Sequence, residues 1–139
     1  MKKRKVQSVI YYCAENNKKH FLLLQMNKKR NFLWQNVTGG VDEGEDFTQA
    51  AIREAKEETN LLDENIKSIQ QTQLEYSFTD QWKKNVIEKV FIIHCHKHWE
   101  IKIDPTEHHS FKWVLEENIS KDSVHYESNY FALLEAMDL

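Results

Sequence analysis

The chain has 139 residues, of which 40% are hydrophobic and 12% aromatic, so it can bury a core and is not a disordered chain. It carries 19 Lys and Arg against 22 Asp and Glu, and this formal net charge of −3 argues against a general nucleic-acid-binding protein. Three glycines and one proline exclude collagen-like and low-complexity classes, and the length predicts one domain over residues 1–139.

The N-terminal segment joins a basic cluster, residues 2–5, to an apolar run at residues 6–14. Two polar residues interrupt the run and no small-residue cleavage site follows, so we expect a first strand rather than a signal peptide. No segment approaches the about 18 apolar residues of a membrane span. The two cysteines, Cys13 and Cys95, are expected to be reduced, and we predict a cytoplasmic protein.

Local patterns predict the remaining elements in chain order. Strands are expected at residues 6–14, 20–25, 33–38, 69–78, 85–96 and 110–114, and helices at 46–59 and 125–137. Residues 26–31 form a polar, basic loop. Asp46 is the expected N-cap of the first helix, with Gln49 in capping-box position. This mixed order predicts an α/β or α+β fold.

All the glycines of the chain, Gly39, Gly40 and Gly44, lie within six consecutive residues, immediately before the first predicted helix. Glycine permits positive φ angles and close approach of the backbone to a ligand. The lysine of a P-loop is absent, and the segment is not a dinucleotide-binding fingerprint. We therefore expect a loop that approaches a metal or phosphate in another way.

Three glutamates of the predicted helix, Glu54, Glu57 and Glu58, share one side because their spacings are three and four residues. Two interpretations are open. The side could be a solvated face, neutralised locally by Arg53 and Lys56. Alternatively it could bind Mg²⁺ or Mn²⁺, which prefer carboxylate oxygens. The glycine loop just before the helix favours the metal site.

The segment with this spacing resembles the Nudix box. The box is written as Gly, five residues, Glu, seven residues, Arg-Glu, an aliphatic residue, any residue, Glu-Glu, any residue, Gly and an aliphatic residue. Here it runs Gly39, Glu45 and then Arg53-Glu54-Ala55-Lys56-Glu57-Glu58-Thr59-Asn60-Leu61. Ala55 replaces a larger aliphatic residue, and Asn60 replaces the closing glycine. Because Asn tolerates the left-handed conformation that ends helices, we expect a left-handed φ at Asn60.

The resemblance implies the Nudix fold, a mixed β-sheet sandwiched between α-helices. It also implies a Mg²⁺- or Mn²⁺-dependent hydrolase that cleaves a nucleoside diphosphate linked to another group. By position in the box, Glu54 and Glu58 would be principal metal ligands, and Glu57 a further ligand or a water bridge. Arg53 would orient a neighbouring glutamate through an ion pair. Glu45 would support the site from outside the metal's ligands, or act as a base.

The glycines have an implied role as well. Gly39 and Gly40 would bring the end of the preceding strand to the phosphates of the substrate, and Gly44 would turn the chain before the helix.

Segments outside the box, at residues 33–39, 106–113 and 127–129, resemble a branch of the family that hydrolyses dihydroneopterin triphosphate. In that branch Glu107 would lie near the metals as a ligand or base, although a surface charge at a strand edge would explain it too. Trp34 could stack on a pterin or a base, or belong to the core. Arg30 could reach substrate phosphates, or be a solvated loop residue.

The histidines at His94, His96 and His98 would share one face of a continuous strand. They could bind Zn²⁺ or Ni²⁺ adventitiously, but a partly exposed strand also explains them.

The leading expectation is a pyrophosphohydrolase, monomeric or homodimeric, acting on a nucleotide or pterin triphosphate. The alternatives are hydrolysis of dinucleoside polyphosphates, of NDP-sugars or of oxidised dNTPs. Dinucleoside polyphosphate hydrolases often carry Pro-Gln-Gly-Gly where this chain has Val37-Thr38-Gly39-Gly40, which weakens that alternative. A non-catalytic nucleotide sensor is a further class, and the intact Arg53, Glu54, Glu57 and Glu58 argue against it.

Overall fold

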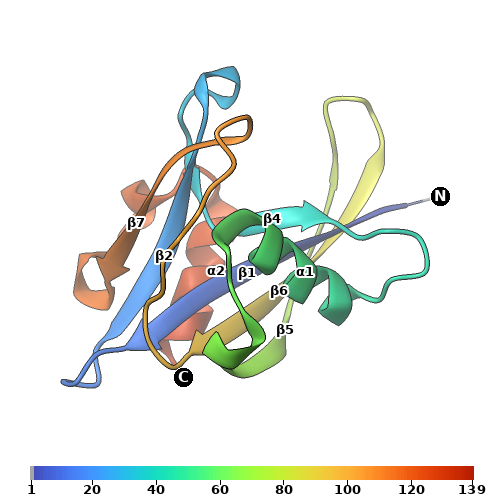
Figure 1. Ribbon diagram of the computed structural model, residues 1–139. Helices are drawn as coiled ribbons and strands as arrows, with labels where there is room; N and C mark the ends of the chain where they lie inside the picture. Colours follow the sequence, from blue (N-terminus) through green and yellow to red (C-terminus); the bar gives the residue numbers. More distant parts are fainter. Residues whose placement is uncertain (1) are drawn as a thin grey trace.

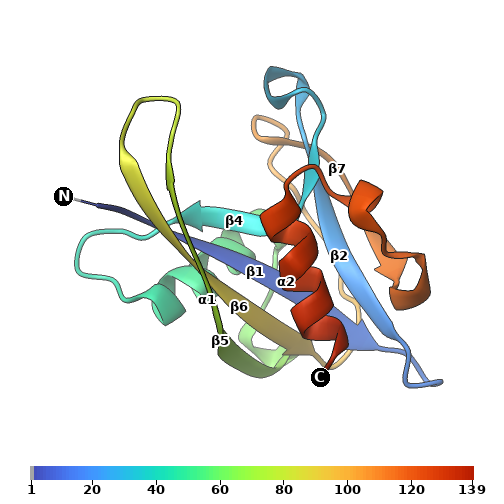
Figure 2. The same ribbon diagram turned by 180° about the vertical axis from the view of Figure 1, so that it is seen from behind.

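The computed structural model describes residues 2–139 and contains a seven-stranded mixed sheet with a helix on each side (Figures 1 and 2). The elements are β1 (Lys3–Cys13), β2 (Lys19–Met26), β3 (Trp34–Gln35), β4 (Val37–Gly40), α1 (Phe47–Thr59), β5 (Ile66–Thr79), β6 (Asn85–Cys95), β7 (His108–Leu115) and α2 (Glu127–Met137). The strand order is β3-β2-β1-β6-β5, with β4 also paired to β1 and β7 to β2. The expected α+β fold is confirmed.

The core has two layers because alternate residues of β1 point to opposite faces of the sheet. Val9 packs with Leu133 of α2 in one cluster, whereas Val6 packs with Ala51 of α1 in another. The small side chains of α1, including Ala55, let this helix lie close to the sheet.

The sheet splits along one edge of β1. Residues 5–8 of β1 pair with β4, and residues 11–13 pair with β2, so β2 and β4 diverge (Figure 1). The single strand expected at residues 33–38 is therefore wrong. The chain pairs with β2 through Trp34 and Gln35, then crosses at Asn36 to pair with β1. The Asn36 N–H donates to Asn129 Oδ1 of α2 at 2.7 Å instead of to a strand.

Helix α1 begins and ends as the sequence predicts. Asp46 accepts from the Gln49 N–H, and the Gln49 side chain accepts from the Asp46 N–H, which completes the capping box. Asn60 has φ 64°, and its N–H donates to Lys56 O at 3.0 Å. Its side-chain Nδ2 also donates to Glu100 O at 3.1 Å, a contact that glycine could not make.

Other expectations need correction. The loop at residues 26–31 contains a 3-10 turn, Lys28–Arg30, which Asn27 caps. Strand β6 ends at Cys95, so His96 and His98 lie outside the sheet and the shared face expected from a continuous strand does not form.

His94 stacks on Tyr11, with ring centroids 4.4 Å apart, whereas His98 packs against Tyr12 at 5.6 Å. Because Tyr11 and Tyr12 are neighbours on one strand, their side chains point to opposite faces, and the two histidines are separated with them. Within residues 2–139, none of the helices has the length and apolar character needed to cross a bilayer.

Candidate active site

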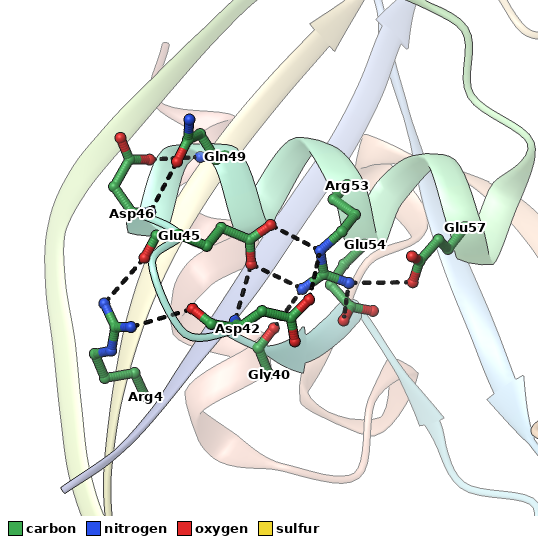
Figure 3. A network of polar contacts seen from close by, with 9 residues as sticks. All are labelled: Arg4, Gly40, Asp42, Glu45, Asp46, Gln49, Arg53, Glu54 and Glu57. Atoms are coloured by element: carbon green, nitrogen blue, oxygen red, sulfur yellow. Dashed lines mark hydrogen bonds and ion pairs between the residues drawn. The ribbon is translucent and has the colours of Figure 1, made fainter.

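Arg53 joins the glycine loop to the acidic side of α1 (Figure 3). Its Nε and Nη2 donate to the two carboxylate oxygens of Glu45 at 2.8 and 3.0 Å. Its Nη1 donates to Glu54 at 2.9 Å and to Glu57 at 3.1 Å, and Nη2 also donates to Gly40 O at 2.7 Å. Since a guanidinium holds its donors in one plane, these contacts orient three glutamates together.

Glu45 shapes the loop from the other side of this ion pair. Its Oε1 accepts from the Asp42 N–H at 2.9 Å, and Arg4 donates to the main-chain oxygens of Asp42 and Glu45 (Figure 3). The hydrogen bonds from Arg53 and from the Asp42 N–H hold the pKa of Glu45 down at about 2. Both oxygens of Glu45 are therefore occupied by protein donors, which suits an orienting role.

The depressed pKa of Glu45 predicts a pH-dependent contribution to folding. A carboxyl group with a lower pKa in the folded state stabilises the fold above its unfolded pKa, and the contribution falls away as the pH drops toward about 2. Glu45→Gln should therefore lower the melting temperature most at neutral pH, and the gap from wild type should narrow below about pH 4.5. Thermal melts at pH 7 and pH 3.5 test this. A gap that stays constant or widens in acid would refute it.

Gly39 permits the close approach of Glu54 to β4. A Cβ atom built on Gly39 would overlap the carboxyl end of the Glu54 side chain, whereas one built on Gly40 meets no atom of residues 2–139 within 4 Å. Burial raises the pKa of Glu54, and the ion pair with Arg53 opposes that shift. The glycine that opens the box is thus needed for space beside a carboxylate.

Glu58 lies deepest in the acidic group. It is 8% exposed, and its Oε2 atom has no hydrogen-bond partner among the described residues. Burial, and then the charges of Glu54 and Glu107, raise the pKa of Glu58 to about 9. Its Oε1 lies 3.5 Å from His108 Nε2, and neither nitrogen of that buried imidazole has a hydrogen bond to any other residue of the described chain.

These unpartnered groups fit a metal ion. One ligand atom each from Glu58, Glu107 and His108 lie within 4.8 Å of one another. Burial lowers the pKa of His108, which favours the neutral imidazole that a metal requires. The structure therefore brings Glu107 of the β6–β7 connection to the end of α1, where the box glutamates lie.

A cavity of about 560 Å³ lies on the α2 side of β4. Arg30 lines it, as do Gln35 and Thr38, which are joined by a hydrogen bond of 3.1 Å. Trp34 is not among the lining residues. It packs against the cluster beneath α2, and the Lys112 ammonium lies 4.1 Å from its ring centroid.

No individual role was predicted from the sequence for four buried polar residues that line this cavity or hydrogen-bond to its lining, namely Gln7, Asn36, Glu88 and Asn129. The available signal was a polar residue at an inward position of an apolar strand, as with Glu88 between Val86 and Val90.

Comparison with known proteins shows which proteins this chain and its fold resemble. The NUDIX domain matches residues 4–134. Dihydroneopterin triphosphate diphosphatase of Escherichia coli is 44% identical over 59 residues, which are 42% of this chain and only 38% of that enzyme. RNA pyrophosphohydrolase of Pelagibacter ubique is 31% identical, over 73% of this chain and 71% of that one. The crystal structure of a C. elegans Ap4A hydrolase in a binary complex is 27% identical, with a TM-score of 0.78, over 97% of this chain and 95% of that one.

Proposed function

Because this chain belongs to the NUDIX domain family, we propose that it hydrolyses a pyrophosphate bond of a nucleoside-triphosphate-like substrate, using Mg²⁺ or Mn²⁺. One observation carries the proposal: a buried Glu58 oxygen that has no partner within residues 2–139, beside Glu107 and His108 and next to the Arg53 ion-pair network. An isolated buried carboxylate costs free energy, and a cation is the partner that its surroundings suit.

The residues that would hold the cation are Glu54, Glu57, Glu58 and Glu107, and His108 beside Glu58 offers a further ligand atom. When bound, the divalent cation supplies charge neutralisation of the phosphate oxygens and lowers the pKa of the attacking water. Arg53 keeps Glu54 and Glu57 in place through its two Nη1 contacts. Glu107 serves as a further ligand or as the base that accepts a proton from the water.

The substrate would enter through the cavity on the α2 side of β4, opposite the side on which α1 and its glutamates lie. Lys3, Lys5 and Arg30 line that cavity, and their positive charge would attract a phosphate chain. Dihydroneopterin triphosphate and (d)NTPs carry such a chain on a heterocycle. Hydrolysis of a dinucleoside polyphosphate is the second candidate, favoured by the likeness to the Ap4A hydrolase over almost the whole chain.

A substrate panel tests the proposal directly. Purified protein with Mg²⁺ should release pyrophosphate or phosphate from at least one of dihydroneopterin triphosphate, GTP, dATP, diadenosine tetraphosphate and GDP-mannose, and EDTA should stop the release. If none is hydrolysed with either Mg²⁺ or Mn²⁺, the enzymatic proposal fails and a nucleotide-sensing domain becomes the better account.

A further inference from the structure

The wall of the cavity carries a carboxylate that the proposed reaction does not use. Glu88 of β6 lines the cavity but is only 5% exposed. It is paired in register with Lys5 of β1, and both side chains line the cavity. A carboxylate in this position needs donors, because burial removes it from water.

A relay of buried amides connects α2 to this carboxylate. Asn36 Nδ2 donates both to the main-chain oxygen of Asn129 at 3.2 Å and to Gln7 Oε1 at 2.8 Å. Gln7 Nε2 in turn donates to Glu88 Oε1 at 2.9 Å. A main-chain carbonyl can only accept, so it fixes which end of Asn36 is the amino group, and hence the orientation of Gln7.

The relay therefore holds Glu88 with Oε1 as an acceptor. No described residue donates a hydrogen bond to Glu88 Oε2, and Glu88 lines the cavity, so Oε2 is the oxygen left for a ligand. Burial raises the pKa of Glu88, whereas the hydrogen bond from Gln7 and the charge of Lys5 lower it. Both of these neighbours favour a carboxylate that presents acceptors only.

Side chains around the mouth of the cavity suit a flat ring. Phe78, Trp82 and Tyr126 line the cavity and are all exposed. Aromatic faces bind heterocycles by stacking, without choosing among them. Selection must then come from the edge of the ring, where donors and acceptors differ.

We propose that Glu88 selects substrates by accepting hydrogen bonds from the adjacent ring N–H and amino group of a 2-amino-4-oxopyrimidine edge. Guanine and pterins share this edge, with two neighbouring donors. Adenine offers a donor beside an acceptor, and hypoxanthine lacks the amino group. The inference rests on the proposed function for the phosphate end of the same substrate. Gln7 and Asn36 are positioning residues, because they act through Glu88.

The geometry also connects the proposed ring-binding site at Glu88 to the acidic group on α1. Thr38 lines the cavity, and its neighbour Gly39 lies against Glu54. Lys5 of β1 is paired in register with Glu88 of β6 on one side and with Gly40 of β4 on the other, so its charge lies between the cavity and the glycine loop. A heterocycle at Glu88 would thus direct its phosphates past Lys5 toward the glycine loop and Glu54.

The test compares GTP with ITP, which differ only in the amino group. We expect wild-type protein with Mg²⁺ to prefer GTP by about tenfold or more in kcat/KM, because a hydrogen bond to a charged acceptor is lost with ITP. In Glu88→Gln the amide presents a donor to the amino group, so the ratio should fall to about 1 or below. The matched control Glu117→Gln removes an exposed carboxylate that pairs with Lys18, and it should keep the wild-type ratio.

A comparison of dihydroneopterin triphosphate with GTP distinguishes a pterin from a guanine ring. The substrate with the higher kcat/KM identifies the ring that Glu88 binds. A wild-type GTP/ITP ratio near 1, or an unchanged ratio in a folded Glu88→Gln, would overturn the inference while leaving the hydrolase proposal intact. If no triphosphate is hydrolysed, the binding affinities of GTP and ITP are measured in EDTA, and their ratio tests the inference in place of the ratio of kcat/KM values.

Discussion

Glu58→Gln should remove hydrolysis almost completely while the protein stays folded. A divalent cation contributes several kcal/mol of transition-state stabilisation, so losing a principal ligand should lower kcat by about 10²–10⁴-fold. Burial holds the pKa of Glu58 at about 9, so the metal-free carboxyl carries a proton at neutral pH, and glutamine has nearly the same shape and charge. The metal-free stability should therefore change by only about 1 kcal/mol or less.

Steady-state kinetics with Mg²⁺ and urea unfolding in EDTA measure the two effects. Glu117→Gln, the exposed matched control, should keep both properties. Wild-type activity in Glu58→Gln would show that this carboxylate is not a ligand. A collapse of metal-free stability would show that its role is to hold the fold.

Gly39→Ala should lower activity through Glu54. The φ of Gly39 lies outside the left-handed region, so alanine is compatible with the backbone, but its Cβ would occupy the space of the Glu54 carboxyl end. Glu54 can move away by a rotamer change that costs about 0.5–1.5 kcal/mol. A displacement of about 1 Å at a reacting site can cost about 10²-fold in rate, so we expect a 10- to 100-fold lower kcat with modest destabilisation.

Gly40→Ala is the matched comparison, because an added methyl group there meets no atom within 4 Å in the part of the chain that the structure describes. Its loss of activity should be clearly smaller than that of Gly39→Ala. Equal activity of the two variants would mean that the position of Glu54 against Gly39 does not matter to the reaction.

The parts of the structure that depend on neighbours in the chain could be predicted from the sequence. The capping box at Asp46 and the left-handed Asn60 are each decided within one turn of α1, and both are confirmed. The acidic side of α1 follows from helical spacing alone. That Glu107 would lie near these glutamates came only from the family resemblance, since no local pattern connects the β6–β7 connection to α1.

What could not be predicted depends on how strands pair. The crossing at Asn36 exists because β2 and β4 share one edge of β1, and nothing in residues 33–38 signals that split. The end of β6 at Cys95, which separates His94 from His98, likewise depends on where the pairing of β6 with β1 and β5 stops. The amide relay to Glu88 joins residues of β1, β6 and α2 with Asn36 at the crossing between β3 and β4, so it becomes visible only once the sheet has formed.

The central claim is that Glu58 belongs to a divalent-cation site, and Mn²⁺ binding tests it most directly. Free Mn²⁺ can be followed by electron paramagnetic resonance during titration of wild type, Glu58→Gln and Glu117→Gln, without substrate. We predict that wild type and Glu117→Gln bind Mn²⁺ alike, and that Glu58→Gln binds at least about tenfold more weakly. Equal Mn²⁺ affinity in Glu58→Gln and wild type would contradict the claim.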